Sequence, residues 1–255
     1  MNPKNLNLAQ EEVVLLSEGK KIHGWFFKQV ALKDPKGLIL FFHGNGENRS
    51  SHYLALSWML EKGYDYFIFD YQGYGESEGK PSPESTVSDG ISALKWFFIK
   101  AKEERYSHSS LIVFAQSLGG AVALRSLSEY QLIEPIKDNA IKWVVLDSTF
   151  LSYQKAGMSL LTKSWITFLF QPLVPLLLSD RWAPIDHLTQ LPKTHFLVIH
   201  GNHDRQVDFK LGNELFTSLP SPKKRMVVKG GGHINGFFIE NGIYRDKFLK
   251  IVESI

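Results

Sequence analysis

Three polar residues in separate loops have the chemistry of a nucleophile, a base and an acid. The first, Ser117, follows the apolar run 111–115 and precedes a glycine pair, a pattern that predicts a buried strand turning sharply into a helix. Such a turn exposes the hydroxyl and points the positive end of the helix dipole at the group that the hydroxyl attacks. The residues two before and two after the serine have to be small, and here they are Ala115 and Gly119. Taken alone, the pattern also fits a serine that only caps a helix.

A serine hydroxyl is a weak nucleophile, so it needs a base and a group that orients that base. Asp204 lies in a loop after the apolar run 196–199, and His233 follows three glycines after the run 225–228. The glycines let the backbone bend sharply, which leaves room for the imidazole to reach inward. Nucleophile, acid and base occur in this order in one known class of catalytic triad. Ser117, Asp204 and His233 are therefore the candidate catalytic residues.

Alternating strands and helices would position these loops. The runs 12–16 and 21–27 predict a hairpin, and strands are predicted at 37–42, 64–70, 111–115, 143–146, 196–199 and 225–228. Helices are expected at 56–62, from Ser82-Pro83, after Ser117, at 211–219 and from Tyr244. This alternation predicts an α/β fold with about eight strands in a mostly parallel sheet and helices on both faces. Chemistry in such sheets gathers at the carboxyl ends of the strands, where all three candidate residues lie.

Five loop motifs, in order and spacing, resemble the α/β-hydrolases over nearly the whole chain. They are His43-Gly44-Asn45-Gly46, Asp70-Tyr71-Gln72-Gly73-Tyr74-Gly75-Glu76-Ser77, Ala115-Gln116-Ser117-Leu118-Gly119-Gly120, Gly201-Asn202-His203-Asp204 and Gly232-His233. The first two are similar to a subgroup that includes membrane-associated serine hydrolases and protein depalmitoylases. The chain departs from that subgroup at Gln72, where arginine is usual, and at Asp208, where proline is usual. Neither departure lies in the proposed triad, but both weaken the inference that this chain acts on the same substrate as members of that subgroup.

The resemblance implies a role for each site residue. It makes Ser117 the nucleophile, His233 the general acid/base and Asp204 the orienting carboxylate. It also places the oxyanion donors at the backbone N–H groups of Asn45 and Leu118. A glycine-rich loop and a helix N-terminus are places where N–H groups can point at developing negative charge.

Other polar residues at the same sheet edge offer alternatives. Asp147 ends the strand after the nucleophile helix and is a rival for the acid, and Asp208 is a weaker third candidate. His200 and His203 lie three residues apart next to Asp204, but on a strand-to-loop segment this spacing does not converge on a metal ion. We therefore expect no metal and no cofactor. His43 is expected to hold the oxyanion loop by hydrogen bonds rather than to move protons.

Residues 150–181 interrupt the alternation and contain the most apolar stretch of the chain, 158–178. Its length would allow a membrane span, but a single crossing would separate Ser117 from Asp204 and His233. The segment is better interpreted as a small lid over the strand ends, with extra core packing as the alternative. Its aromatic residues, Trp165, Phe168 and Phe170, are the candidate lining of a substrate pocket, and peripheral contact with a membrane through them is a further hypothesis.

Composition sets the remaining expectations. The chain has 255 residues, 44% of them hydrophobic, which is enough for a single α/β domain over residues 1–255. A dispersed net charge of +3 argues against a nucleic-acid partner. The absence of cysteine excludes disulfides and thiol catalysis and fits a reducing compartment, so a cytoplasmic location is expected. The sequence does not indicate the oligomeric state.

The expected activity is hydrolysis of an ester or thioester with an apolar acyl group, through an acyl-enzyme intermediate. The expected partner is a small-molecule or acylated substrate. Amide or peptide hydrolysis and acyl transfer remain alternatives that use the same three residues. A catalytically silent binding protein of the same fold is the alternative from another class.

Overall fold

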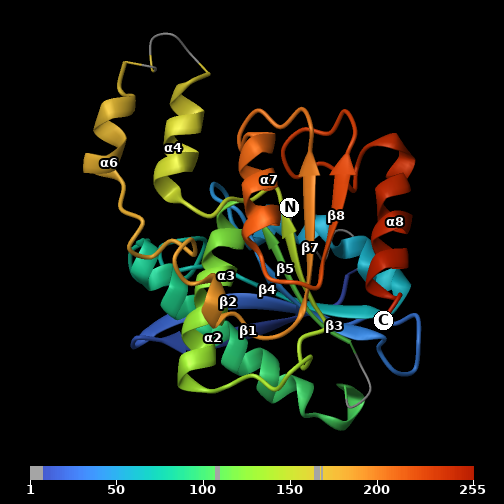
Figure 1. Ribbon diagram of the computed structural model, residues 1–255. Coiled ribbons are helices and arrows are strands. Elements are labelled where there is room, and N and C mark those ends of the chain that lie inside the picture. Colours follow the sequence, from blue (N-terminus) through green and yellow to red (C-terminus); the bar gives the residue numbers. More distant parts are fainter. Residues whose placement is uncertain (1–7, 107–109, 164–166, 168) are drawn as a thin grey trace.

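The computed structural model describes residues 8–106, 110–163, 167 and 169–255, and an eight-stranded sheet runs through its centre (Figure 1). The strands are β1 (Gln10–Ser17), β2 (Lys20–Phe27), β3 (Gly37–Phe42), β4 (Tyr64–Phe69), β5 (Ser110–Gln116), β6 (Trp143–Asp147), β7 (His195–Gly201) and β8 (Lys223–Val228). Their order in the sheet is β1-β2-β4-β3-β5-β6-β7-β8. The pairs β1–β2 and β2–β4 are antiparallel, and all other pairs are parallel. The expected α/β fold with a mostly parallel sheet is confirmed.

Burial on both faces explains why the central strands are continuous apolar runs. Leu40 and Phe42 of β3 pack into one hydrophobic cluster, while Ile39 and Phe41 pack into another on the opposite face. Parallel strands covered on both sides have this composition, because successive side chains point to opposite faces.

The four longest helices divide between these two faces. The helices that the structure describes are α1 (Arg49–His52), α2 (Pro83–Ala101), α3 (Leu118–Ile133), α4 (Tyr153–Leu161), α6 (Val174–Leu177), α7 (Phe209–Ser218) and α8 (Ile243–Val252). Residues of α2, α3 and α7 join the first cluster, and residues of α8 join the second. As predicted, α2 begins at Pro83, and Ser82 caps it by accepting a hydrogen bond from the backbone N–H of Ser85 at 3.0 Å.

The segment before Gly63 differs from the regular helix that its apolar spacing predicts. It forms the single turn α1 and then two stretches of 3₁₀-helix, Tyr53–Ala55 and Ser57–Lys62. Spacings of three and four residues suit either helix type, so the pattern did not distinguish them. Gly63 ends the segment as expected, with a φ of 89° that favours glycine.

Helices α4 and α6 stand beside each other, away from the sheet (Figure 1). We call residues 152–178 the helical hairpin. A Cβ atom added to Gly157 of α4 would lie 2.7 Å from Cδ1 of Leu178 and 3.5 Å from Cγ1 of Val174. The missing side chain therefore lets the two arms approach, and Val174 is the buried residue of α6. Among the described residues, no helix has the length and apolar character needed to cross a bilayer.

Candidate active site

Ser117 lies between the end of β5 and the start of α3, at the sharp turn that the sequence predicts. Its backbone has φ 53° and ψ −123°, a combination that non-glycine residues rarely adopt. The surrounding structure holds this conformation. Its N–H donates to the carbonyl of Asp147 at 2.9 Å, and its carbonyl accepts from the Thr149 hydroxyl at 2.5 Å. Strain of this kind costs about 1–3 kcal/mol and persists where neighbouring contacts fix it.

The close approach of the end of β3 leaves no room for a side chain at Gly119. A Cβ atom there would lie 2.3 Å from the carbonyl oxygen of His43 and 2.4 Å from that of Phe42. Glycine at position 119, two residues after Ser117, therefore lets the first turn of α3 pack directly on the end of β3.

Hydrogen bonds join the three candidate catalytic side chains. Nε2 of His233 lies 3.0 Å from Oγ of Ser117, and Nδ1 of His233 lies 2.8 Å from Oδ2 of Asp204. An ionised carboxylate only accepts hydrogen bonds, so Nδ1–H donates to Asp204 and Nε2 is left to accept the serine proton. The three residues follow β5, β7 and β8, and the first and last are 116 positions apart in the chain.

The environment of Asp204 favours its charged form. Burial acts to raise the pKa of this carboxyl group, but the hydrogen bond from His233 and the backbone N–H groups of Gln206 and Val207 lower the pKa below its usual value. Those two N–H groups donate to Oδ1 at 2.8 and 2.9 Å. Asp204 therefore stays ionised near neutral pH and can hold the imidazole in one orientation.

Asp147 has a different environment. Its Oδ2 accepts a hydrogen bond from Nε2 of Gln116 at 2.9 Å, and burial raises its pKa to about 6. The hydrogen bond on Nδ1 of His233 goes to Asp204 instead. Asp147 contributes its backbone carbonyl to the turn at Ser117.

The backbone N–H groups of Asn45 and Leu118 lie on the two segments that meet at Ser117. Leu118 is the first residue of α3, and Asn45 follows β3 in the loop whose Gly44 lies against Ser117, with 3.3 Å between an added Cβ and that of the serine. Within the described residues, neither N–H group has a hydrogen-bond acceptor. The side-chain Oδ1 of Asn45 accepts a hydrogen bond from the Tyr74 hydroxyl at 2.7 Å, which fixes the loop.

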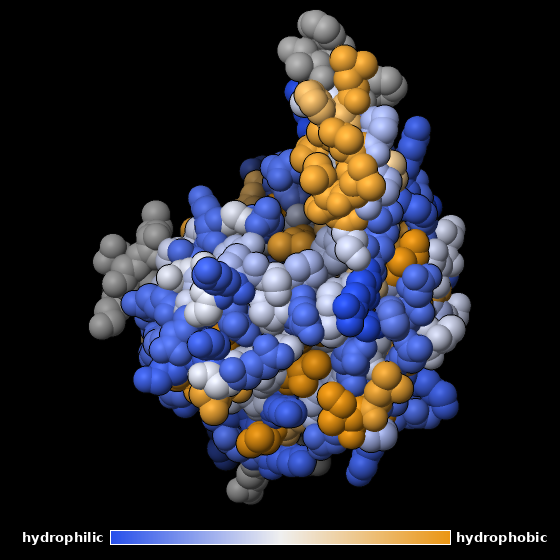
Figure 2. All heavy atoms as spheres, turned by 90° about the vertical axis from the view of Figure 1, so that its left-hand side faces the viewer, coloured by the Kyte–Doolittle hydropathy of each residue, from blue (hydrophilic) through white to orange (hydrophobic). Residues whose placement is uncertain are grey.

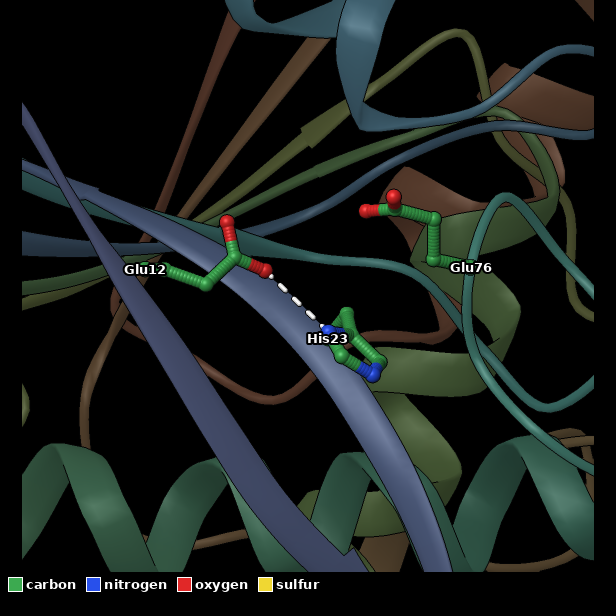
Figure 3. Close-up of side chains that lie close together, drawn as sticks. All are labelled: Glu12, His23 and Glu76. Atoms are coloured by element: carbon green, nitrogen blue, oxygen red, sulfur yellow. Dashed lines mark hydrogen bonds and ion pairs between the residues drawn. The ribbon is translucent and has the colours of Figure 1, made fainter.

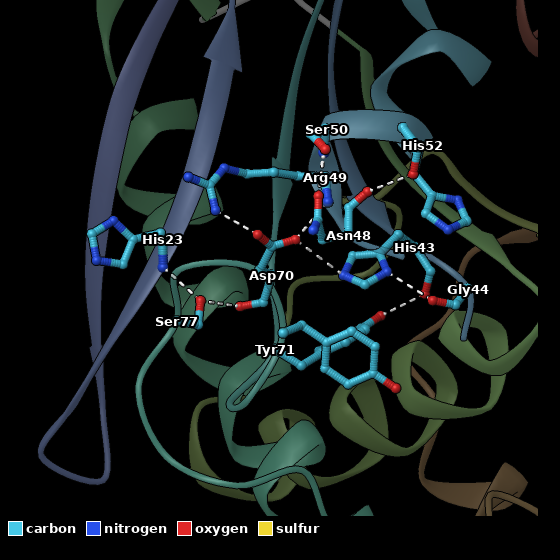
Figure 4. Close-up of polar contacts among 12 residues, drawn as sticks. His23, His43, Gly44, Asn48, Arg49, Ser50, His52, Asp70, Tyr71 and Ser77 are labelled. Atoms are coloured by element: carbon cyan, nitrogen blue, oxygen red, sulfur yellow. Dashed lines mark hydrogen bonds and ion pairs between the residues drawn. The ribbon is translucent and has the colours of Figure 1, made fainter. Parts of the chain in front are cut away.

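A buried polar cluster holds the base of this loop (Figure 4). Nδ1–H of His43 donates to the carbonyl of Gly44 at 2.7 Å, and the Tyr71 hydroxyl donates to the carbonyl of His43 at 3.0 Å. Asp70 accepts from the backbone N–H of Arg49 at 2.6 Å and forms a buried ion pair with the guanidinium. Burial, then the neighbouring His52, lowers the pKa of His43 to about 3, so this imidazole is neutral at physiological pH.

A cleft of about 610 Å³ opens beside Leu118. Its walls come from the loop after β4, the start of α2, the helical hairpin and the segment that follows the hairpin. They include Tyr74, Pro83, Leu118, Tyr153, Leu177, Leu178 and Trp182. This size and this mainly apolar lining are typical of small-molecule sites.

Of the three aromatic residues expected in the pocket, Phe170 is not among the residues that line this cleft. Phe170 is 54% exposed on the helical hairpin. Trp165 and Phe168 lie outside the described residues. Tyr153 and Trp182, which do line the cleft, were not singled out from the sequence, because only the packing of the hairpin brings them there.

Among the described residues, one group of side chains has the spacing of metal ligands. The ligand atoms of Glu12, His23 and Glu76 lie within 4.8 Å of one another (Figure 3). Arg49 forms ion pairs with both carboxylates, and Nε1 of Trp25 donates to Glu12 at 2.8 Å. The guanidinium already supplies the positive charge, so we assign no metal to this group. At the other candidate, Nε2–H of His200 donates to the carbonyl of Val207 at 3.0 Å and is engaged there.

The strand order and the serine at the turn between β5 and α3 are those of the α/β-hydrolase fold. Residues 33–191 match the profile of the family described as serine aminopeptidase, S33. The chain belongs to this family of α/β-hydrolases.

Three similar proteins illustrate the relationship. The chain is 29% identical over 253 residues to the uncharacterized protein YfhR of Salmonella typhimurium, covering 96% of this chain and 82% of that protein. It is 28% identical over 215 residues to the alpha/beta hydrolase domain-containing protein WAV2 of Arabidopsis thaliana, covering 81% and 66%. The esterase Pf2001 of Pyrococcus furiosus superposes with a TM-score of 0.74 at 21% identity, covering 100% of this chain and 94% of that one. At this identity, the structural likeness establishes a shared fold.

Proposed function

We propose that this protein is a serine hydrolase that cleaves ester or thioester bonds of substrates with an apolar acyl group. The observation that supports this most directly is the unbroken hydrogen-bond path from Ser117 through His233 to Asp204, with distances of 3.0 and 2.8 Å. A protein that only bound ligands would have no need of a base directed at a serine hydroxyl.

In the first half of the proposed reaction, Oγ of Ser117 attacks the substrate carbonyl and Nε2 of His233 takes the hydroxyl proton. The N–H groups of Asn45 and Leu118 stabilise the oxyanion of the tetrahedral intermediate. A single donor of this kind contributes about 2.7–4 kcal/mol to the transition state. The intermediate collapses, His233 gives its proton to the leaving alcohol or thiol, and the acyl group remains on Ser117.

In the second half, His233 removes a proton from a water molecule, which attacks the acyl-enzyme. The tetrahedral intermediate then releases the free acid, and the proton returns to Ser117 through His233. Asp204 keeps Nδ1 protonated throughout and stabilises the imidazolium while it exists. The steps assigned to these residues need no metal or redox cofactor.

We further propose that residues 150–181 act as a lid and that the acyl group lies in the cleft beneath it. Support comes from the position of the cleft, which is bounded by Leu118 on one side and by Leu177 and Leu178 of the hairpin on the other. An apolar acyl chain suits these walls better than a small polar group does. The similarity of two loop motifs to depalmitoylases makes acylated proteins one candidate substrate class.

Amide hydrolysis is the second candidate, and the description of the matching family as serine aminopeptidase favours it. The same acyl-enzyme chemistry serves both reactions. Parallel assays with p-nitrophenyl esters, acyl thioesters and aminoacyl anilides separate the two. Activity confined to the anilides would reject the ester and thioester proposal.

The nucleophile is tested by labelling with a fluorophosphonate probe. We expect the probe to modify Ser117 alone and the Ser117→Ala variant to remain unlabelled and inactive. Because the residues act as a unit, Ser117→Ala/His233→Ala should lose no more activity than either single variant. A labelled Ser117→Ala protein, or losses that multiply in the double variant, would refute the assignment.

A further inference from the structure

The outer surface of the helical hairpin exposes large apolar side chains. Leu169, Leu176 and Leu177 are 73%, 81% and 77% exposed, and Leu160, Phe170, Leu173 and Leu178 are between 40% and 55% exposed. In Figure 2 the hairpin forms an orange ridge that stands above a mostly blue body. Proteins rarely expose a contiguous apolar surface of this kind unless it contacts a membrane or another protein.

The chain segment that forms this ridge carries charge of one sign. Residues 148–179 contain no aspartate or glutamate, and Lys155 and Lys163 are their only charged residues. Lys155 forms an ion pair with Glu214 of α7. The Lys163 ammonium donates to the backbone carbonyls of Arg205 and Gln206, which places it beside the exposed Arg205. An anionic bilayer surface attracts such cations, whereas acidic residues along the ridge would oppose the contact.

The ridge continues into the proposed active site. Leu177 and Leu178 belong both to the exposed surface and to the wall of the cleft beside Leu118. An acyl chain could therefore pass from lipid to cleft along apolar side chains without entering water. A second copy of the chain seated on the ridge would cover this path instead of using it, so the observations favour a lipid surface over a dimer.

We propose that the helical hairpin docks on the surface of a bilayer containing anionic lipids, and that the enzyme takes its acyl substrate from that bilayer. Uptake of the acyl substrate rests on the proposed hydrolase function, whereas docking of the hairpin on the bilayer does not. The helices of the hairpin, α4 and α6, have nine and four residues, too few to cross a bilayer, so the contact is peripheral. Apolar faces of such elements enter the interface by about 5–10 Å.

The docking is tested by vesicle flotation of the full chain as the Ser117→Ala variant, which keeps the hairpin intact and cannot alter the lipids by hydrolysis. The vesicles are phosphatidylcholine alone or phosphatidylcholine mixed with phosphatidylglycerol. Leu169→Ser/Leu176→Ser removes two exposed side chains from the ridge. Leu132→Ser/Ile133→Ser is the matched control, since these residues at the end of α3 are 66% and 64% exposed.

We expect flotation with the mixed vesicles and weaker flotation with neutral ones. The ridge variant should partition at least about tenfold less, because one buried leucine contributes about that factor. The control variant should partition like its parent. Absence of flotation, or an equal loss in both double variants, would overturn the proposal. So would light scattering that reveals a dimer which the ridge substitutions dissociate, because the ridge would then be an interface between copies.

Fluorophosphonate labelling separates the two proposals. Labelling of the wild-type chain at Ser117, together with no flotation of Ser117→Ala, would leave the hydrolase function standing and reject docking. Flotation of Ser117→Ala, together with no labelling of the wild-type chain, would keep docking and reject the hydrolase.

Discussion

Two carboxylates near His233 differ in what surrounds them, and this difference supports Asp204 rather than Asp147 as the proposed orienting acid. Asp204 accepts hydrogen bonds from His233 and from two backbone N–H groups, which keep it ionised. Asp147 accepts from the neutral amide of Gln116, and burial raises its pKa to about 6. Only Asp204 has the hydrogen bond to Nδ1 of His233 that an orienting acid needs, which supports its proposed role.

Replacing each carboxylate by its amide should therefore have unequal effects on catalysis. Asp204→Asn removes the charge and the acceptor that fix the imidazole, and we expect kcat to fall about 10³–10⁴-fold. Asp147→Asn should reduce kcat less than about tenfold. Steady-state kinetics on one p-nitrophenyl ester measures both. The reverse ranking would move the acid to Asp147.

The raised pKa of Asp147 also predicts how stability depends on pH. The folded state favours the protonated acid, so its contribution is fully present below the unfolded pKa of 3.8 and is lost as pH rises through about 6. An asparagine side chain stays neutral at all these pH values, so the variant does not lose this contribution to stability. Between pH 4 and pH 8, the free energy of unfolding of Asp147→Asn should rise by about 2 kcal/mol relative to wild type. Urea unfolding at both pH values measures this, and a pH-independent difference would contradict it.

At the scale of elements, the contact between the start of α3 and the end of β3 determines the position of the nucleophile. The obstacle to a side chain at Gly119 is backbone, the carbonyl oxygens of Phe42 and His43. Backbone at the end of a central strand cannot move aside without disturbing the neighbouring loop. The Tyr71 hydroxyl holds one of the same carbonyls.

Gly119→Ala is therefore expected to lower the free energy of unfolding by about 1–3 kcal/mol and to reduce activity, because the helix has to shift. Gly157→Ala is the matched control in another helix. Its added Cβ approaches only side-chain atoms, Cδ1 of Leu178 closest, and alanine favours helix by about 1 kcal/mol. Urea unfolding should show the control within about 1 kcal/mol of wild type. Equal effects of the two substitutions would exclude the close packing on β3 as the cause.

The elements themselves could be predicted well wherever burial imposes one pattern. The apolar run 37–42 corresponds to β3, and the Ser82-Pro83 signal marks the start of α2, because a cap and a first-turn proline act locally. The segment before Gly63 could not be predicted in detail, since its spacing suits two helix types. The positions of Ser117, Asp204 and His233 followed from strand ends, and the structure brings their side chains together.

The walls of the cleft could not be predicted, because they depend on how distant elements pack. Tyr153, Trp182 and the start of α2 meet there only once the helical hairpin and the segment after it have packed beside the start of α2. Apolar composition indicated Phe170 just as strongly, yet its side chain lies exposed on the hairpin. Apolar composition identifies the segment that contributes to the cleft, and tertiary packing decides which of its side chains line the cleft.

At the scale of the whole molecule, the cleft joins the loop after β4, the start of α2 and the hairpin, and its volume of about 610 Å³ predicts a preference among acyl chains. Each methylene that leaves water contributes about 0.8 kcal/mol, or about three- to fourfold in kcat/KM. We expect kcat/KM for p-nitrophenyl esters to rise by this factor per methylene from acetyl to medium length and then to level off. A series that is flat, or highest for acetyl, would argue against an acyl pocket.

His233 follows β8, the last strand to be made and an edge of the sheet that pairs only with β7. Ser117 is therefore synthesised long before His233, and under the proposed mechanism a chain that has not reached His233 should be inactive. Cleaving the polypeptide in the 219–222 turn should give two fragments, each without catalytic activity. Turnover would return only when they reassociate, which would make the pair a split reporter of proximity.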